Sequence, residues 1–384
     1  MNQKSVNSLV TILETGAPGA NVAELVCRDG NGGMDKKGET GSSSTGLGHI
    51  PGFDYLRVFF MLMVLLAHTN FFSTFGDQRQ AAIGPGPNIW DIVYFQLQAT
   101  AVPAFVLMSL LLFSVKIPTW ECSWDRVKKL SYLYVFWVGA WVLFSKCRPE
   151  PGFYGLLEFL FRGGGWVLYT FVVLMILTPL SVVAYRMSQK SSWLGLAISM
   201  LVVIATFAYL HDGYKWLRNY YYWVPTCFVM MPFAAVLLVP RLKELKTCAA
   251  LRWKWVLGLL LISAICALAE WHFSAPREHI FEPLKRVWLP KHARPSVQFS
   301  AMALIVASLG VKSQVNVIVQ FFSRNSLGVY CIHPFILRGI ADPVRSIVDP
   351  IAPGLSILAS CVVIAVVCSL ISEFLRLAFK QRLI

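Results

Sequence analysis

An apolar run at residues 53–72, FDYLRVFFMLMVLLAHTNFF, constrains this chain more than any other feature. A helix needs about 20 apolar residues to cross a bilayer, and the run is long enough. It nevertheless contains Asp54, Arg57 and His68. Arg57 and His68 are separated by nearly three helical turns, so they share one side of the helix and lie about 16.5 Å apart along its axis. Ionisable groups inside a membrane are costly, and they indicate a functional site.

The composition of the whole chain is that of a membrane protein. Of its 384 residues, 56% are hydrophobic and only 14% are charged, which excludes an ordinary soluble domain. We therefore interpret the net charge of +14 as loop Lys and Arg that set topology and meet anionic lipid, and not as a nucleic-acid surface. The nine cysteines lack the spacing of a zinc site, so neither a metal nor a disulfide framework is expected.

The pattern of apolar runs predicts an all-α polytopic membrane protein with about ten transmembrane helices around a central cavity. Residues 1–50 are polar and rich in Gly and Ser, and they are expected to form a flexible cytoplasmic tail before a membrane domain at 51–384. Lys and Arg favour a topology with both termini in the cytoplasm. The predicted spans are 53–72, 89–115, 130–144, 166–185, 193–210, 221–239, 255–273, 297–311, 326–340 and 355–379.

Four segments between the predicted spans have a distinct character. Residues 153–161 are aromatic and Leu-rich around Glu158, which is typical of a helix lying at the membrane interface. Residues 116–129, 241–254 and 274–296 are basic, and each is expected to be a loop. The last of these falls on the outer side. Two interpretations are open, a surface for an anionic acceptor or lipid and a solvated loop, and the solvated loop is favoured.

Each ionisable residue of the first span also has an ordinary structural explanation. His68 can be a neutral buried group bonded to a backbone carbonyl. Asp54 and Arg57 stand at positions i and i+3 and can form an ion pair at the helix end. Arg57 can also extend to the interface as a long cationic side chain. The three residues together, on nearly one face, favour the functional interpretation.

Short motifs occur in a fixed order over residues 51–340. The first span has D-x-x-R, ten further residues and His; the second has VPAFVLMS at 102–109; the fourth has GWVL at 165–168 and TPL at 178–180; a late span has SLGVYCIHP at 326–334. The third span is preceded by Arg126, Lys128 and Lys129 and continues with Tyr134 and Trp137. This series resembles the bacterial type-3 membrane acyltransferase family, whose ten-span members O-acylate envelope sugars.

The resemblance implies an O-acyltransferase of the bacterial inner membrane that uses acyl-CoA, with acetyl-CoA as the expected donor, and has no permanently bound cofactor. It implies a catalytic group of His68, Arg57 and Asp54. A positioned imidazole can act as general base on the acceptor hydroxyl or carry the acyl group itself, and the sequence does not decide between these roles.

The resemblance also implies how the substrates are bound. Arg57 suits the donor phosphates, and Arg126, Lys128 and Lys129 can add to that attraction, although ordinary topology-setting charge is the favoured explanation for these three. The implied acceptor is an envelope glycan, exopolysaccharide or glycolipid. Expected partners are this acceptor, membrane lipid and the machinery of polysaccharide synthesis or export.

Three further residues are candidates for substrate or oxyanion contacts. Tyr330 and His333 are three positions apart and therefore share a helical face, where they can line the cavity with His68. An equal alternative is that Pro334 kinks a helix end and His333 bonds a freed carbonyl. Glu270 can orient an imidazole or bind sugar, but an interfacial position is the favoured interpretation.

A proton- or solute-coupled transporter is the alternative function, because it also places His and Arg inside a bundle. The scarcity of central carboxylates and the lack of a visible inverted repeat in the sequence count against it.

Overall fold

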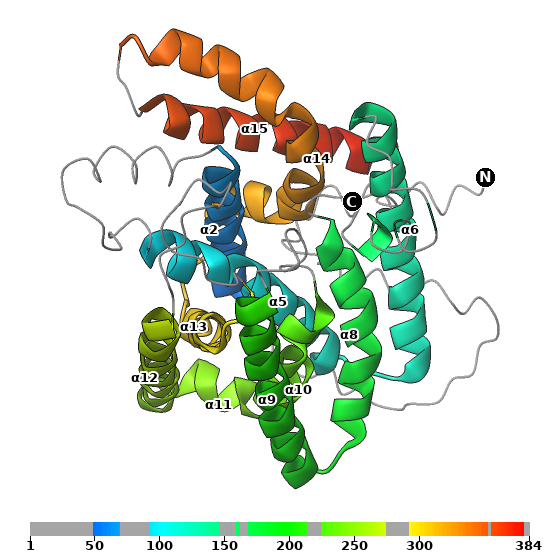
Figure 1. The fold of residues 1–384 in the computed structure, drawn as a ribbon, viewed down its shortest axis with the longest axis vertical. Coiled ribbons are helices and arrows are strands. Elements are labelled where there is room, and N and C mark those ends of the chain that lie inside the picture. The colour runs from blue at the N-terminus through cyan, green and yellow to red at the C-terminus, as the bar shows by residue number, and fades with distance from the viewer. Residues whose placement is uncertain are drawn as a thin grey trace, which may run out of the picture. The chain divides into compact units, whose positions relative to one another are not determined.

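The computed structural model describes residues 49–69, 92–145, 152, 155, 159–161, 168–213, 224–273, 292–351 and 355–379. Within these ranges every regular element is a helix (Figure 1). The predicted tail falls at 1–48, which lies outside the described residues, and so does most of the predicted interfacial helix at 153–161.

Eight helical segments among the described residues are long and apolar enough to cross a membrane, and the chain is an all-α polytopic membrane protein. Two of these segments are composite, since a π-helical turn and a 3-10 turn precede α5, and 3-10 turns flank α10. The bounds are α2 Pro51–His68, η2 Val93–Leu97, η3 Gln98–Thr100, α5 Ala101–Val115, α6 Trp120–Ser145, α8 Tyr169–Arg186, α9 Gln189–Gly213, η4 Pro225–Phe228, α10 Met230–Leu238, η5 Val239–Arg241, α11 Leu242–Thr247, α12 Ala249–Phe273 and α15 Leu355–Ala378.

The other two predicted spans correspond to helices of different character. α13, Pro295–Ser308, is apolar but short. α14, Val317–Val348, is the longest described helix. The prediction of a short span interrupted at Pro334 is wrong, because α14 continues on both sides of this proline. Neighbouring helices and side chains can satisfy the backbone groups that a proline frees inside a membrane bundle, so the helix need not end.

Two of the predicted basic loops are also wrong in their secondary structure. α6 begins at Trp120, so Arg126, Lys128 and Lys129 belong to its first turns rather than to a loop. Likewise, the segment 241–254 contains α11 and the first residues of α12. Lys, Arg, Glu and Leu are all good helix formers, so a helix can extend beyond its apolar part into a charged segment.

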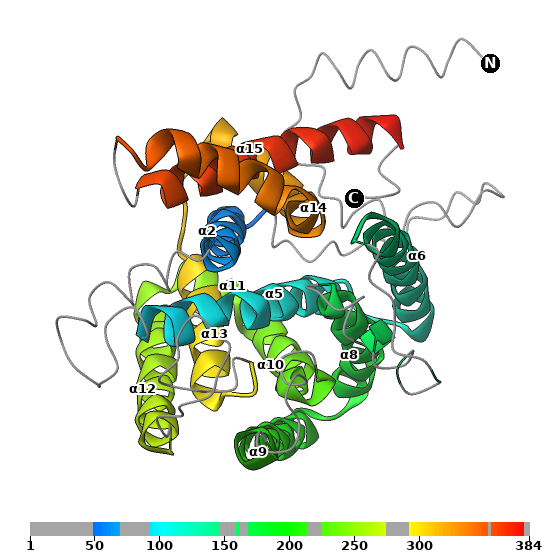
Figure 2. The same cartoon turned by 45° about the horizontal axis from the view of Figure 1, so that its top comes forward.

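α2 packs against α14, α15, α5 and α13. Figures 1 and 2 show α14 and α15 as a hairpin along one side of α2, with α5 and α13 on another. The approach to α13 requires a glycine, because a Cβ atom at Gly52 would lie 1.9 Å from the carbonyl oxygen of Ser308. α6 lies beside α8, and α12 lies beside α13.

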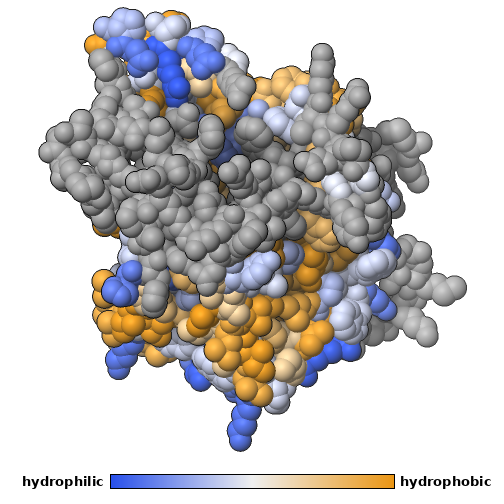
Figure 3. Space-filling model, in the orientation of Figure 1, coloured by the Kyte–Doolittle hydropathy of each residue, from blue (hydrophilic) through white to orange (hydrophobic). Residues whose placement is uncertain are grey.

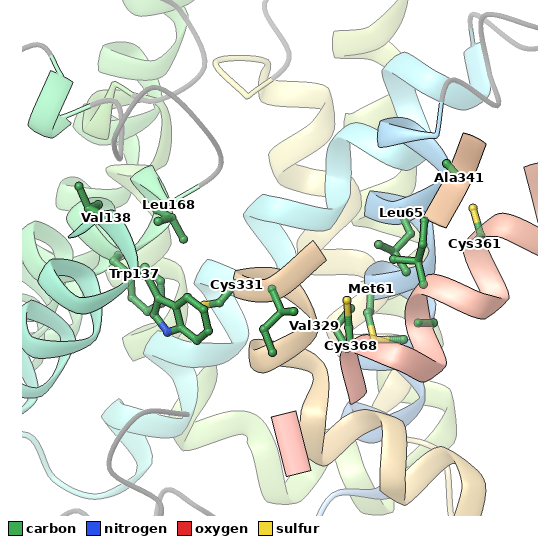
Figure 4. Close-up of a cluster of buried hydrophobic side chains, with 14 of the residues drawn as sticks. Met61, Leu65, Trp137, Val138, Leu168, Val329, Cys331, Ala341, Cys361 and Cys368 are labelled. Carbon is green, nitrogen blue, oxygen red and sulfur yellow. The ribbon is translucent and has the colours of Figure 1, made fainter. Parts of the chain in front are cut away.

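A buried apolar cluster joins α2 to the C-terminal hairpin. Figure 4 shows Met61 and Leu65 of α2 beside Val329 of α14 and Cys361 and Cys368 of α15. Met61 and Val329 keep only 4% and 1% of their surface exposed. Burying side chains of this size is worth about 1.5–3 kcal/mol each, so the cluster fixes α14 against α2 over the turns that lead to His68.

The surface of the bundle is apolar where lipid would contact it. On α12, Leu257, Leu261, Ile265 and Leu268 follow one another at helical spacing, and Leu268 is 74% exposed. Figure 3 shows a broad hydrophobic area on one face of the molecule, with hydrophilic residues along its margins. Large exposed apolar areas are unfavourable in water and expected in a bilayer.

Candidate functional site

The site is centred on two histidines that the fold brings together from distant parts of the chain. His68 is the last residue of α2, and its ring centroid lies 5.1 Å from that of His333 on α14, with 41° between the ring planes. His333 is fully buried. His68 itself is half-buried, and its ring lies against the buried side chain of His333.

His333 has one ring nitrogen in a structural bond and one without a partner. Its Nδ1 lies 3.0 Å from the backbone carbonyl oxygen of Val329, one turn earlier. Its Nε2 is buried and has no hydrogen-bond partner among the described residues. Buried polar atoms are rarely left unsatisfied, so an unpaired ring nitrogen indicates a position for a polar ligand or a water molecule.

A small cavity adjoins this ring. It has about 10 Å³ of room, and its polar lining includes Ser326, Tyr330 and His333. The rest of the wall is apolar and includes Met61 and Leu65 of α2. About 10–15 Å³ is the least that accommodates one water molecule, so the closed bundle has space for a single small polar group next to His333.

Tyr330 connects this cavity to α8. The Thr170 hydroxyl donates a hydrogen bond of 2.9 Å to the Tyr330 phenol oxygen, and the Tyr330 ring centroid is 6.2 Å from that of His333. The neighbouring Tyr169 hydroxyl lies 3.0 Å from Nε2 of His292. The first turn of α8 thus places one hydroxyl, that of Thr170, against Tyr330, and another, that of Tyr169, against His292.

The end of α2 is held in place directly after His68. The Thr69 hydroxyl lies 3.1 Å from the sulfur of Cys361 on α15, and the Thr69 carbonyl oxygen accepts a hydrogen bond from Arg345 on α14. Thr69 is almost completely buried. Because the next residue is anchored to both helices of the hairpin, the backbone that carries His68 is restrained.

Asp54 and Arg57 lie at the opposite end of α2 from His68. Arg57 Nη1 is 3.4 Å from Asp54 Oδ1, and the Ser323 hydroxyl of α14 donates a 2.5 Å hydrogen bond to the same oxygen. The sequence interpretation of a helix-end ion pair is confirmed. The Arg57 side chain is 25% exposed, whereas that of Asp54 is only 9% exposed.

The basic residues at the start of α6 have different environments. Arg126 donates to the carbonyl oxygen of Ser109 at 3.1 Å and to its hydroxyl at 2.7 Å, which joins α6 to α5. Lys128 is exposed and lies 3.7 Å from Asp125, and Lys129 is exposed. Arg126 therefore has a structural role, while the two lysines lie at the surface.

Glu270, for which the sequence favours an interfacial position, is buried between helices in a polar network around Arg294. Arg294 Nε donates to Glu270 Oε2 at 2.8 Å, and its two terminal nitrogens donate to the carbonyl oxygen of Phe95 and the amide oxygen of Gln96, each at 2.7 Å. The backbone nitrogen of Ser296 donates to Glu270 Oε1 at 2.9 Å. Arg294 is fully buried, so the solvated interpretation of the segment 274–296 is wrong at this residue.

The network supports the helix that carries His68. Phe95 belongs to the π-helical turn η2, and it packs with Met63, Leu66 and Ala67 of α2. π-helical turns leave the regular hydrogen-bond pattern of a helix, and they are frequent at functional sites. The bond from Arg294 to the Phe95 carbonyl stabilises this turn and therefore the surface on which the last turns of α2 rest.

Sequence reasoning did not single out Arg294. Its charge was counted with a basic loop, although it immediately precedes the α13 helix. The available signal was its position: Glu270 is close to the end of α12, Arg294 is next to the start of α13, and consecutive spans place such residues at the same membrane level.

The fold and the site define a polytopic helical membrane protein in which a half-buried histidine, His68, contacts a fully buried one, His333. Residues 50–373 match the family model described as an acyltransferase domain, so the chain belongs to this acyltransferase family. The match confirms the type-3 membrane acyltransferase family that the motifs indicated. No curated protein and no solved structure gives a significant match to the chain.

Proposed function

We propose that this protein transfers an acyl group, with acetyl as the expected group, from acyl-CoA to a hydroxyl of an envelope glycan or glycolipid, and that the reaction takes place beside His68 and His333. The proposed location is the bacterial inner membrane, with both termini in the cytoplasm. The proposal extends the family assignment to a donor, an acceptor class and a reaction site.

The observation that carries the proposal is the contact between His68 and the fully buried His333, whose Nε2 has no hydrogen-bond partner among the described residues. His333 and Tyr330 line a cavity, and the His68 imidazole lies against His333, so these three side chains supply both proton acceptors and proton donors. Acyl transfer to a hydroxyl needs such groups, because a proton leaves the attacking oxygen while negative charge develops on the carbonyl oxygen.

In one route, His68 is the general base. A ring nitrogen of His68 takes the proton of the acceptor hydroxyl as the oxygen attacks the thioester carbonyl carbon. The carbonyl oxygen becomes negatively charged in the tetrahedral intermediate, and the Tyr330 hydroxyl donates a hydrogen bond to it. The carbon–sulfur bond then breaks, CoA leaves as the thiolate, and the imidazolium returns the proton to the sulfur.

In the other route, His68 carries the acyl group. A ring nitrogen attacks the thioester carbon, the carbon–sulfur bond breaks, CoA leaves as the thiolate, and an acyl-imidazolium forms. The acceptor hydroxyl then attacks this acyl group, the carbon–nitrogen bond breaks to release neutral imidazole, and the hydroxyl proton passes to solvent, where it balances the charge of the thiolate. The carrier route separates the donor step from the acceptor step. It therefore suits a reaction whose donor and acceptor come from opposite sides of a membrane.

The donor phosphates are assigned to the end of α2 that carries Arg57. The Arg57 side chain is partly exposed there, and a guanidinium binds phosphate oxygens through two parallel hydrogen bonds. Arg57 and His68 are about 16.5 Å apart along the helix axis. The extended arm between the phosphates and the thioester of acyl-CoA is suited to spanning such a separation.

We expect Tyr330→Phe to lower the acyl-transfer rate by about 10²-fold, because removing one donor from a developing oxyanion costs about that much. Thr170→Val is the matched variant, since it removes the partner of Tyr330 and leaves the phenol in place. Initial rates in proteoliposomes measure both. Equal, small losses in the two variants would assign Tyr330 to packing alone.

The proposal itself is tested with purified protein in vesicles supplied with labelled acetyl-CoA and an envelope glycan fraction. We expect label to appear in ester linkage on the glycan, and to appear only when both substrates are present. Movement of unmodified solute or protons across the vesicle membrane, with no ester formed, would contradict the proposal and favour the transporter alternative.

A further inference from the structure

A second cavity lies away from the histidine site, between α9, α10, α12 and α13. Its volume is about 530 Å³, within the usual range of small-molecule sites, and its wall is almost entirely apolar. Trp193 of α9, Leu237 of α10, Trp255 of α12 and Phe299 of α13 contribute to it. All of these helices belong to the membrane-spanning part of the chain, so the molecules that reach this groove are lipids.

One end of the groove is basic. Lys254 lines it and is exposed, and it forms no ion pair with any residue that the structure describes. The segment around it carries a strong excess of positive charge, with Arg241, Lys243, Lys246, Arg252 and Lys254 against Glu244 alone. A lysine near a membrane surface attracts anionic lipid by about 1 kcal/mol.

The same end contains two tryptophans. Trp193 and Trp255 lie close to the first residues of α9 and α12, respectively. Tryptophan is enriched at the level of lipid headgroups, because its ring is apolar and its N–H is polar. From Lys254 to Ile262, at the apolar end, the groove follows α12 for about 12 Å.

No side chain fills the groove next to Gly258. A Cβ atom at Gly258, in its wall, would meet no heavy atom within 4 Å. At Gly195 of α9 a Cβ atom would instead lie 2.4 Å from the Phe233 ring, so α9 and α10 are in close contact just beside the groove. The empty volume is therefore confined to the side that faces α12.

We propose that this groove binds one acyl chain of an anionic phospholipid, with the phosphate of its headgroup beside Lys254. An anionic phospholipid suits both parts of this site, because its acyl chain can fill the apolar groove and its phosphate can pair with the ammonium group of Lys254. The ligand is structural, and the site is separate from the acyl-transfer site.

The test uses the full-length protein purified in detergent, mixed with palmitoyl-oleoyl phosphatidylglycerol or the matching phosphatidylcholine, and native mass spectrometry counts the retained lipids. We expect one tightly retained phosphatidylglycerol. Gly258→Phe fills the groove and should lower its occupancy at least tenfold. Lys254→Gln should lower the preference for phosphatidylglycerol over phosphatidylcholine about fivefold, the equivalent of about 1 kcal/mol for one lysine.

Gly139→Phe is the matched control, because Gly139 of α6 also has no heavy atom near its missing Cβ and lies outside the groove. It should leave phosphatidylglycerol retention unchanged. Unchanged retention in both Gly258→Phe and Lys254→Gln would overturn the proposal. Displacement of phosphatidylglycerol by an equal number of palmitoyl-CoA molecules would also overturn it, since the groove would then hold a donor chain.

Discussion

Replacing His68 with alanine should lower the rate of acyl transfer by about 10²–10⁴-fold, the usual contribution of a positioned base. His68 lies at the end of a restrained helix, and its ring centroid is 5.1 Å from that of His333. No other residue of α2 is a histidine, so α2 has no substitute for this base. Initial rates in proteoliposomes with labelled acetyl-CoA measure the loss. Far-ultraviolet circular dichroism checks that the helices are retained.

His272→Ala is the matched control for this experiment. His272 is an exposed histidine near the end of α12, and neither proposed route uses it. We expect its rate to equal that of the unaltered protein. If His68→Ala also keeps the full rate while remaining folded, His68 has no chemical role, and both proposed routes are wrong.

The largest expected loss of stability follows from Glu270→Leu. This change leaves the fully buried Arg294 without its carboxylate partner, and breaking a buried ion pair from one side costs about 3–5 kcal/mol. The measurement is unfolding by sodium dodecyl sulfate in mixed micelles, followed by circular dichroism. We expect the midpoint to fall markedly.

Two comparisons identify the cause of that loss. The double variant Glu270→Leu/Arg294→Met removes both charges and should recover much of the stability, because an apolar pair of similar volume avoids the unpaired charge. Glu244→Ala breaks the exposed pair with Arg241 and should cost less than about 1 kcal/mol. Equal losses for Glu244→Ala and Glu270→Leu would contradict the assignment of the buried network.

The sequence was sufficient to predict the helical class of the protein and the approximate place of most spans. Apolar length determines whether a segment can cross a membrane, so α2, α8 and α15 were predicted within a few residues. Helices that begin inside charged segments were predicted to start too late, because hydropathy detects only the apolar part of a helix. The start of α6 at Trp120 is the clearest example.

The sequence predicted which residues belong to the candidate site, but it did not predict which of them are in contact. The spacing of Tyr330 and His333 predicts a shared helical face, yet it does not say which helix that face meets. The contact between His68 and His333 depends on the packing of α14 against α2, which involves Met61 and Val329 in separate parts of the chain. The burial of Arg294 likewise depends on three segments meeting, namely η2, α12 and the start of α13.

The central claim is that His68 and His333 act as one reaction site, and a double-mutant cycle on the acyl-transfer rate tests it most directly. Residues that act as a unit give strongly non-additive losses. We predict that His68→Ala and His333→Ala each lower the rate, and that the variant carrying both changes is no slower than His68→Ala alone. Independent losses that multiply in the double variant would contradict the claim.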